Sequence, residues 1–579
     1  MAKKAQWPIE FVMSQEQGVV RAPKDFDWVR KNIPCQAACP AGTDIPGYLD
    51  AIAHKDYAAA YRINLRDNVF PAVLGRVCTR PCEPACRHGW EGLGEPVAIC
   101  FSKRSASDFM QRTEPVVLEP VFPSSGKTIA VVGAGAAGLT VARELALWGH
   151  HVTVFEKNDI PGGLMVQGIP PFRLPRDIVA REIEQIRLIG VDIRCGVAVG
   201  KVIPFATLRE EYDAVIVAAG THKPFIPDLP GVNAPGIQHG LEFLKKVHQD
   251  VPLAVGKHVI VIGGGFTAVD CARTAKRLGA EKVKVLYRRS EAEMYITGHE
   301  VKEMKNEGIT FEPMTMPLAF LNGAQATERV RVQCCKTRLD APDESGRRKP
   351  VPVPDSVFEL EADLVLLGTG QEPETSWLDQ ACIEDPGVFK AGDFSMGALS
   401  LIDAIGDAKK CARKVDAYVM GERRLRDVVV IENAESTGRT RDMDAIPRQV
   451  MSLLPLEQRA LTDEVELGLN EQQSVEEAKR CYLCHYKFEI DNDLCIYCDR
   501  CLKVMPVDNC IVKISGLQYD KSGRITGYTP SRDSRDYNML FIDQNECIRC
   551  GACAEVCPVE CISLQKVRLE TRSAADLPL

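Results

Sequence analysis

The middle of the chain alternates short apolar runs with helix-like segments. The run 128–132 (TIAVV) is apolar and partly β-branched, and a glycine-rich turn, a helix-like stretch and a second apolar run at 152–155 follow it. Such runs are typical of buried parallel strands, and their alternation with helices predicts an α/β fold. A further buried strand is expected at 212–220.

The same arrangement recurs later in the chain. Residues 257–289 repeat the order of strand, glycine-rich turn, helix and strand, and another buried strand is expected at 363–370. A run at 388–394, followed by an amphipathic helix to about residue 418, then resumes the first unit. Two similar units, one nested within the other, amount to an internal repeat.

Each unit carries a dinucleotide-binding fingerprint. In the first, the spacing is GxGxxG and the second strand ends on an acid. The first glycine makes a tight turn, the second lets the backbone approach a pyrophosphate and the third lets helix pack on strand, while the acid accepts from a ribose hydroxyl. The expected nucleotide contacts are Gly133, Gly135, Ala136, Ala137, Gly138, Glu156 and Lys157.

The second fingerprint differs at the end of its second strand. This strand ends on Tyr287, which Arg288 and Arg289 follow. An acid here would repel a 2′-phosphate, whereas two guanidinium groups would bind one, so the sequence favours NADPH over NADH. The alternative is that the two arginines form a solvated surface. The turn itself is Gly263, Gly264, Gly265, Phe266, Thr267 and Ala268.

Composition and charge narrow the class of protein. The 579 residues are 45% hydrophobic, carry a net charge of −8 and lack a dense basic run, which argues against nucleic-acid binding. No apolar run approaches the roughly 18 residues of a membrane span, and the N-terminus lacks an apolar signal segment, so we expect a cytoplasmic protein. The 23 cysteines gather at the two ends, which indicates metal or redox chemistry.

Two cysteine runs lie near the C-terminus. One has the spacing of bacterial ferredoxins, in which the fourth cysteine binds the other cluster of a pair: Cys547, Cys550, Cys553 and Cys557. Its partner run is Cys495, Cys498 and Cys501. Met505 holds the expected fourth position of that run, and Cys510 is the nearest replacement. A three-iron cluster or a labile fourth site remains open there, and Cys561 is left over.

Several motifs in combination resemble one flavoprotein family. They are GAGAAG with Glu156, PGGLMVQGIPPFRLP at 161–175, GGGFTAVDCAR, YRRSEAEM and AGDF. Over about residues 30–420 they resemble the small subunit of glutamate synthase, the NADPH half of dihydropyrimidine dehydrogenase and the flavin subunits of NAD(P)H:ferredoxin oxidoreductases. The resemblance implies FAD on the first unit and NAD(P)H on the second.

The resemblance also implies further cofactor contacts. Asp393, after Gly392, corresponds to the family's acid at the FAD sugar chain. Phe266 departs from the polar residue of the relatives. The loop expected beside the flavin ring, and the glycines at the ends of two later strands, add Gly163, Leu164, Gly168, Gly220 and Gly370.

Similarity to the same family assigns the amino-terminal cysteines. One expected cluster uses Cys78, Cys82 and Cys86. Its fourth ligand in some relatives is an oxygen donor near the position of Lys103, which cannot bind iron, so we expect Cys100 instead.

The other amino-terminal cluster lacks half of its usual ligands. Only Cys35-x3-Cys39 is present, whereas VEEAKRCYLC near the other end resembles the missing CxxC. We therefore expect both ends of the chain to share one cluster, with zinc or no metal at the CxxC as the alternative. The expected ligands are Cys35, Cys39, Cys481 and Cys484.

Together these features predict an α/β protein. Two nested Rossmann-like dinucleotide-binding domains are flanked by a helical N-terminal iron–sulfur domain and a C-terminal α+β ferredoxin-like domain. The expected bounds are 1–122 for the helical iron–sulfur domain, 123–256 with 366–421 for the FAD-binding domain, 257–365 for the NAD(P)H-binding domain, 422–480 for a connector of mostly helical pattern, and 481–579 for the ferredoxin-like domain.

The combination of cofactors predicts the function. A nicotinamide gives two electrons at once and an iron–sulfur cluster passes one, so a flavin belongs between them. We expect an NAD(P)H oxidoreductase with FAD and about four 4Fe-4S clusters, exchanging electrons with a ferredoxin or a larger redox enzyme. The family resemblance implies dissimilatory sulfite reductase as one candidate for that enzyme. No acid–base catalytic residue is expected.

Two other functions stay open at this stage. One is the electron-input subunit of a glutamate synthase, and the other is an assembly scaffold whose flavin is structural. The sequence also leaves open the direction of electron flow and whether the chain forms a homodimer.

Overall fold

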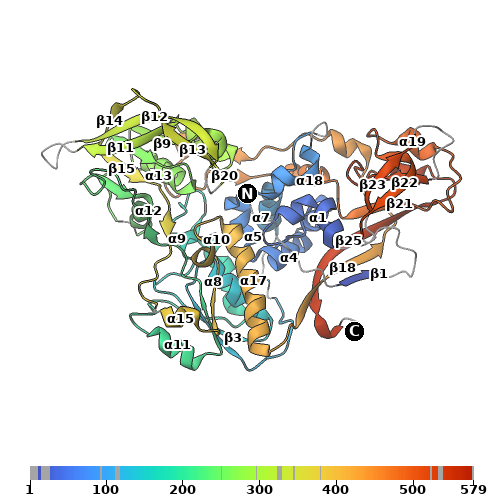
Figure 1. Ribbon diagram of the computed structural model, residues 1–579, viewed down its shortest axis with the longest axis horizontal. Helices are drawn as coiled ribbons and strands as arrows, with labels where there is room; N and C mark the ends of the chain where they lie inside the picture. Colours follow the sequence, from blue (N-terminus) through green and yellow to red (C-terminus); the bar gives the residue numbers. More distant parts are fainter. Residues whose placement is uncertain are drawn as a thin grey trace.

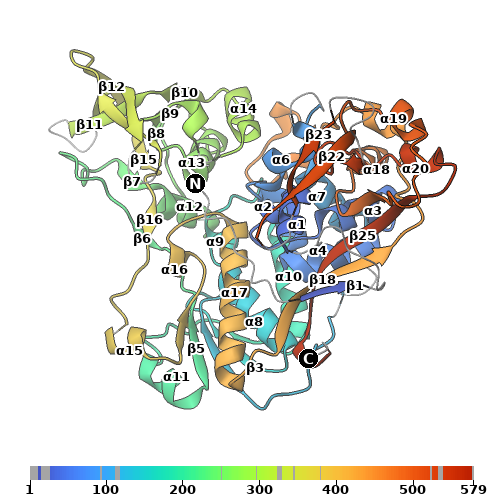
Figure 2. The ribbon, with the colours of Figure 1, turned by 45° about the vertical axis from the view of Figure 1, so that its right-hand side comes forward.

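The chain folds into three lobes in the computed structural model (Figure 1). Two lobes are built on parallel sheets, and the third joins the N-terminal helices to the C-terminal strands, which lie side by side in both ribbon views (Figures 1 and 2). The predicted fold class is confirmed. The structure describes residues 11–14, 26–90, 94–110, 116, 118–249, 251–294, 296–321, 329–342, 346–378, 380–521, 525–531 and 539–576.

The first parallel sheet has the strand order β17-β5-β2-β3-β4. Its strands are β2 (Thr128–Val132), β3 (His151–Phe155), β4 (Asp192–Arg194), β5 (Ala214–Val217) and β17 (Val388–Lys390). Because β17 pairs in parallel with β5 after a long insertion, the chain returns to this sheet. Its helices are α8 (Ala136–Leu147), α9 (Leu164–Gln167), α10 (Arg176–Leu188), α11 (Phe205–Glu211), α15 (Gln380–Glu384), α16 (Asp393–Met396) and α17 (Leu401–Met420).

The second parallel sheet, in the order β10-β9-β8-β15-β7, lies within that insertion. Its strands are β7 (Ile237–His239), β8 (His258–Ile262), β9 (Lys282–Tyr287), β10 (Thr310–Pro313) and β15 (Leu364–Leu367). Its helices are α12 (Gly240–His248), α13 (Phe266–Arg277) and α14 (Gly298–Asn306). A short ribbon links the two units, formed by β6 (Lys223–Pro224) and β16 (Gln371–Glu372).

An antiparallel sheet extends the second unit. It consists of β11 (Thr315–Leu321), β12 (Val330–Pro342), β13 (Arg348–Pro352) and β14 (Phe358–Ala362). β12 pairs with each of the other three, so this sheet is organised around one long strand.

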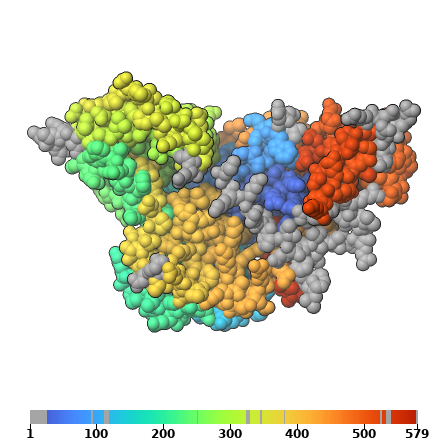
Figure 3. All heavy atoms as spheres, viewed as in Figure 1, coloured from blue at the N-terminus to red at the C-terminus, as the bar shows by residue number. Residues whose placement is uncertain are grey.

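Seven short helices form the N-terminal part of the third lobe. They are α1 (Phe26–Asn32), α2 (Pro34–Ala38), α3 (Ile45–Ala53), α4 (Tyr57–Asn68), α5 (Pro71–Val77), α6 (Cys82–Ala85) and α7 (Ile99–Phe109). Their apolar side chains share one buried cluster with the first parallel unit and the C-terminal strands. The space-filling view accordingly shows the N-terminal (blue) and C-terminal (red) segments in contact (Figure 3).

The C-terminal part contains two small sheets. One has the order β1-β18-β25-β21, with β1 (Phe11–Ser14), β18 (Leu425–Asn433), β21 (Tyr486–Ile490) and β25 (Ile562–Ser573). The other contains β22 (Ile511–Tyr519), β23 (Ile525–Pro530) and β24 (Met539–Ile542). Two one-turn helices flank them, α19 (Arg500–Val504) and α20 (Ala552–Glu555).

The helical pattern expected for residues 422–473 is wrong. This segment begins with β18, whose run VVVI is buried and pairs antiparallel with β25. It also forms β19 (Ser452–Leu453) and β20 (Glu466–Gly468), and only α18 (Glu471–Lys479) is a regular helix of several turns. The pairing partner of β18 lies more than a hundred residues away, so local charge pattern misled the prediction.

Within the described part of the chain, no helix is both long and apolar enough to cross a membrane.

Candidate functional site

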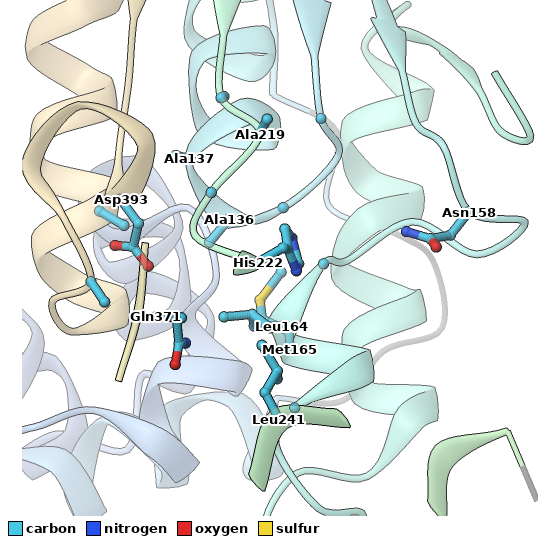
Figure 4. Close-up of a pocket in the computed structure, with 18 of the residues that line it drawn as sticks. Ala136, Ala137, Asn158, Leu164, Met165, Ala219, His222, Leu241, Gln371 and Asp393 are labelled. Atoms are coloured by element: carbon cyan, nitrogen blue, oxygen red, sulfur yellow. The ribbon is translucent and has the colours of Figure 1, made fainter. Parts of the chain in front are cut away.

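A cavity of about 540 Å³ lies where the first unit, the second unit and the N-terminal helices meet. Figure 4 shows Leu164, Met165 and His222 in its centre and Asp393 at one side. The predicted residues that line it are Gly133, Gly135, Ala136, Ala137, Glu156, Lys157, Gly163, Leu164, Gly168, Gly220, Phe266, Thr267 and Asp393. The cavity therefore combines the first fingerprint with the start of helix α13 of the second.

The first glycine turn has the geometry that a dinucleotide requires. Gly133 has φ +106°, and a Cβ there would stand 2.6 Å from the Ala218 carbonyl oxygen. A Cβ on Gly138 would stand 1.9 Å from the Gly133 carbonyl oxygen, so only glycine lets α8 pack this closely. A Cβ on Gly135 would meet only the Gly163 Cα at 4.0 Å. The backbone at Gly135 is thus open to a pyrophosphate at the N-terminus of α8.

Glu156 ends β3 in a fixed position. Its carboxylate accepts from the backbone N–H of Ala134 at 2.8 Å and from that of Asn158 at 2.9 Å, and it is 4% exposed. The side chain therefore stands at the rim of the turn, where an acid accepts from the ribose hydroxyls of a bound nucleotide.

Asp393 is the polar group of this cavity that most needs a ligand. Its Oδ1 is buried and has no hydrogen-bond partner among the described residues, and burial raises the pKa of its carboxyl from the ordinary 3.8 to about 7. A buried oxygen without a donor is costly, and the hydroxyl groups of the FAD sugar chain would supply donors. The residues of this cavity thus fit FAD.

The second turn is built in the same way. Gly263 has φ +147°, and a Cβ there would meet the Gly368 carbonyl oxygen at 2.3 Å. The Tyr287 ring lies so close to Gly264 that a Cβ would stand 2.3 Å from it. Nothing lies within 4 Å of a Cβ on Gly265, so the backbone there is open to a pyrophosphate.

The two predicted phosphate-binding arginines occupy different environments. Arg288 is exposed, whereas Arg289 is 2% exposed and donates from Nε to the Arg348 carbonyl oxygen at 2.8 Å. Arg347 also lies close, since its charge acts on the pKa of Tyr287, which burial raises overall. Arg347 and Arg348 could not be predicted at this site from local sequence, because they follow the second strand by about 60 residues and reach it through β12 and β13.

Three further residues at the boundary between the units were also missed. Arg173 donates to both carboxylate oxygens of Asp270, at 2.9 and 3.0 Å, and its guanidinium lies 5.3 Å from the centre of the Phe266 ring. The aromatic Phe266, which departs from the polar residue that the family resemblance predicts, thus packs under a cation. His222 lines the cavity, and burial with the charges of Lys245 and Lys157 lowers its pKa to about 3, so the imidazole is neutral.

The predicted cysteine ligands gather in four groups. Within the described residues, no three His, Cys, Asp or Glu side chains are close enough to bind a single metal ion. We number the four groups outward from the cavity.

Group 1 consists of Cys39, Cys78, Cys82 and Cys100, whose charges all act on buried Lys103. Cys78 lies between Val77 and Thr79, and both of these line the cavity. Burial raises the pKa of Cys100 to about 12. Several buried thiols ionise together only beside a cation, which the iron of a cluster supplies.

Group 2 consists of Cys35, Cys86, Cys481 and Cys484, which line one small cavity. Burial raises the pKa of Cys35, and the charges of the other three raise it further. The expected meeting of the two chain ends at this group is therefore present in the structure, but with one exchange. Cys86 takes the place expected for Cys39, which lies in group 1 instead.

The exchange follows from two one-turn helices. α2 has Cys35 at its start and Cys39 just past its end, and α6 has Cys82 and Cys86 in the same positions. The helices pack together with Cys35 near Cys86 and Cys39 near Cys82, so they run in opposite directions. Each helix therefore contributes one cysteine to each group.

Group 3 consists of Cys510, Cys547, Cys550 and Cys553. Burial raises the pKa values of Cys510, Cys547 and Cys553, and the charges of neighbouring members of the group raise them further. Group 4 contains Cys495, Cys498, Cys501 and Cys557. In group 4 the Sγ atoms of Cys557 and Cys561 are 3.5 Å apart, so the cysteine that the sequence left over lies beside the fourth ligand position. Cys498 of this group is exposed.

Comparison with known proteins assigns the family. The model of the pyridine nucleotide-disulphide oxidoreductases matches residues 127–416, which is half of the chain. The chain belongs to this family. Two further models match the ends of this pyridine nucleotide-disulphide oxidoreductase: dihydropyrimidine dehydrogenase domain II, 4Fe-4S cluster, over residues 15–115, and a 4Fe-4S binding domain over residues 540–563.

Three relatives are similar over most of this oxidoreductase. It is 35% identical over 504 residues to the NADP(+)-dependent formate dehydrogenase subunit beta of Moorella thermoacetica, covering 78% of this chain and 70% of that protein. It is 35% identical over 510 residues to the NADPH-Fe(3+) oxidoreductase subunit beta of Geobacter sulfurreducens, covering 78% and 75%. It is 32% identical over 440 residues to the glutamate synthase (NADPH) small chain of Azospirillum brasilense, covering 69% and 89%.

These matches confirm the predicted class of this oxidoreductase. It is an enzyme that transfers electrons and combines FAD, a nicotinamide nucleotide and 4Fe-4S centres. The predicted resemblance to the glutamate synthase small chain is confirmed as well. The role of each individual ligand and nucleotide-binding residue stays a prediction.

Proposed function

We propose that the protein moves electrons between NAD(P)H and a partner protein, through FAD in the cavity and then through four iron–sulfur clusters in the order of groups 1 to 4. When bound, FAD takes two electrons as a hydride and releases them singly, which the clusters require. The observation that carries the proposal is the unbroken order of the groups from cavity to surface.

Neighbouring members of this order lie close enough to interact, either through adjacent residues or through the charges of their cysteines. Val77 and Thr79 of the cavity wall flank Cys78 of group 1. The charge of Cys82 acts on Cys35, which joins group 1 to group 2. In the same way Cys484 acts on Cys547, and Cys501 acts on Cys553, which joins groups 2, 3 and 4.

Group 4 supplies the surface where a partner would receive the electron. Around exposed Cys498, the side chains of Leu494 and Ile496 are 60% and 59% exposed. α19 and α20 hold group 4 at the far edge of the molecule (Figure 2). An exposed apolar patch beside a cluster fits a docking surface for a redox protein.

The relatives favour a redox enzyme as this partner. Two of them are named as beta subunits, one of a formate dehydrogenase and one of an NADPH-Fe(3+) oxidoreductase, so we propose that this chain too serves a larger enzyme. Their names give no support to dissimilatory sulfite reductase. A ferredoxin is the second candidate, and the small-chain similarity keeps the glutamate synthase role as the alternative.

NADPH is the proposed nicotinamide substrate. Arg288 is exposed beside the second turn, with Arg347 near the same tyrosine. No acid follows Tyr287 to repel a 2′-phosphate.

Anaerobic addition of NADPH to the holoenzyme tests the proposal. We expect the flavin absorbance to bleach and cluster signals to appear in electron paramagnetic resonance (EPR) spectra. In Cys78→Ser the flavin should still bleach, whereas reduction of groups 2 to 4 should slow at least tenfold.

Cys382→Ser is the matched control, because Cys382 belongs to none of the four groups and should leave both signals unchanged. If NADPH does not bleach the flavin absorbance, the flavin is structural and the protein serves as an assembly scaffold instead. Equal cluster reduction in Cys78→Ser and the wild type would contradict the order of the groups.

A further inference from the structure

Two arginine side chains lie buried at the contact between groups 2 and 3. Arg87 is 2% exposed and Arg549 is 0% exposed. Arg87 directly follows Cys86 of group 2, and Arg549 lies between Cys547 and Cys550 of group 3. Each group therefore contributes one arginine to the contact.

Both guanidinium groups donate to the same atom. Nη1 of Arg87 lies 3.1 Å from the Cys547 carbonyl oxygen, and Nη1 of Arg549 donates to that oxygen as well. Arg549 also donates from Nε to the Tyr486 carbonyl oxygen at 3.2 Å. Nε and Nη2 of Arg87 and Nη2 of Arg549 have no hydrogen-bond partner in the described part of the chain.

These two arginines differ from Arg439 and Arg480, which are also buried in this lobe. Arg439 pairs with Asp444 at 2.6 Å, and Arg480 pairs with Glu477 at 2.7 Å. Neither Arg87 nor Arg549 forms an ion pair with a carboxylate of the described residues. Two uncompensated positive charges at one carbonyl oxygen are costly in a buried site and require a nearby anion.

The cysteines on either side supply that anion once they hold iron. A cluster with its thiolates is negatively charged, and hydrogen bonds to its sulfur atoms are among the features that set its potential. Arg87 lines the same small cavity as Cys35, Cys86, Cys481 and Cys484 of group 2. Arg87 thus faces a ligand of group 2 while it holds the backbone of group 3.

We propose that Arg87 and Arg549 are positioning residues for electron transfer between the clusters of groups 2 and 3, which they link by aiming their unpartnered N–H groups at the cluster sulfur atoms. The inference rests on the proposed function. One electron leaves one cluster and enters the other, with no proton transferred, because guanidinium stays protonated throughout. Reduction adds negative charge, so the two arginines stabilise the reduced state of both clusters.

A redox titration of the holoenzyme, followed by EPR, tests this. Variants Cys484→Ser and Cys550→Ser assign the signals of groups 2 and 3. In Arg87→Gln we expect the ratio of reduced to oxidised cluster at the wild-type midpoint to fall about tenfold for these two groups, which is a shift of about 59 mV to lower potential. Arg87→Lys keeps the charge and should restore most of the ratio.

The control removes an arginine and its carboxylate partner together, near the contact between groups 2 and 3, so that the net charge does not change. Arg439 donates to the Ile548 carbonyl oxygen at 2.7 Å but is paired with Asp444, so Arg439→Gln with Asp444→Asn removes a buried guanidinium without changing the net charge. We expect this double variant to keep the wild-type midpoints. If Arg87→Gln does not retain the iron content of the wild type, Arg549→Gln is titrated in its place.

Unchanged midpoints in the neutral variants, or a shift no larger than in the control, would overturn the inference. A wild-type holoenzyme in which NADPH reduces no cluster would instead overturn the proposed function, so the two failures are distinguishable.

Discussion

Two carboxylates in one cavity are held in opposite ways. Glu156 accepts two backbone hydrogen bonds, whereas Asp393 keeps one buried oxygen without a donor. The Glu156 carboxylate is held in place by the protein alone. The buried Asp393 oxygen gains a hydrogen bond only from a ligand that carries a hydroxyl group. Asp393 is therefore the residue whose substitution most directly reports on FAD.

Asp393→Asn should separate stability from FAD affinity. The carboxyl pKa is raised from 3.8 to about 7 in the folded protein, so the folded state binds the proton more tightly, and stability is lost as the pH rises through 7. Asparagine carries no such charge. In the flavin-free protein, the advantage of Asp393→Asn over the wild type should therefore grow by about 1.4 kcal/mol between pH 6 and pH 8.

Thermal unfolding of both proteins at the two pH values measures this difference. In a titration with FAD, Asp393→Asn should bind the cofactor at least about tenfold more weakly than the wild type. Asp177→Asn serves as control, because the Asp177 side chain is 68% exposed. An advantage of the same size at both pH values would show that Asp393 is already ionised without cost.

Arg288→Gln should change the preference between nicotinamides. Arg288 is exposed beside the second turn, and loss of a charge-assisted bond to a 2′-phosphate should raise the KM for NADPH about tenfold and leave that for NADH within twofold. Steady-state kinetics with both nucleotides measure it. Arg289→Gln is the comparison, since Arg289 is buried against Arg348 and should affect both nucleotides equally. An equal loss on both nucleotides in Arg288→Gln would remove the proposed role.

At the scale of elements, residues 452–468 form a strap that touches all three lobes. The Val465 N–H donates to the Phe172 carbonyl oxygen at 3.0 Å, beside the flavin cavity. Glu464 accepts from Arg76 of helix α5 at 2.7 Å. Arg459 reaches Glu303 and Glu307 of the second unit, at 3.1 and 2.9 Å. The strap therefore fixes the second unit relative to the flavin.

Arg459→Met should loosen this arrangement. Glu303 is 3% exposed, so its carboxylate would lose a buried ion pair, and we expect a cost of about 3 kcal/mol in stability. Hydride transfer from NADPH should slow several-fold, while flavin and iron content stay unchanged. Thermal unfolding and stopped-flow flavin bleaching measure the two effects.

The control is Arg181→Met, which breaks an exposed pair with Asp177 and should change little. If Arg459→Met matched this control in both measurements, the strap would have no part in fixing the second unit.

At the scale of the whole molecule, motifs formed by neighbouring residues could be predicted from the sequence. Contacts between residues far apart in the sequence could not. The glycine turns and Glu156 depend on neighbours in sequence, so their geometry could be anticipated. The proximity of Cys35 and Cys481 could be predicted, because the sequences around them resemble the two halves of one cysteine motif. The exchange of Cys39 and Cys86 depends on how α2 packs on α6, which no local pattern records.

The same limit explains the other misses. β18 pairs with β25, and Arg347 reaches the second turn through β13; in each case the partner lies far along the chain. No motif in the sequence singles out Arg87 or Arg549. Only the packing of the two ends, visible as adjacent blue and red segments in Figure 3, makes them buried neighbours.

The central claim is that electrons pass from the flavin through group 2 to the groups built from the C-terminal run. The most direct measurement mixes NADPH rapidly with the holoenzyme and with Cys481→Ser/Cys484→Ser, freezes both and follows the cluster signals by EPR. In the variant, which should lack about four irons, we predict a reduced group 1 while groups 3 and 4 stay oxidised on the wild-type timescale. Reduction of groups 3 and 4 at the wild-type rate would contradict the account.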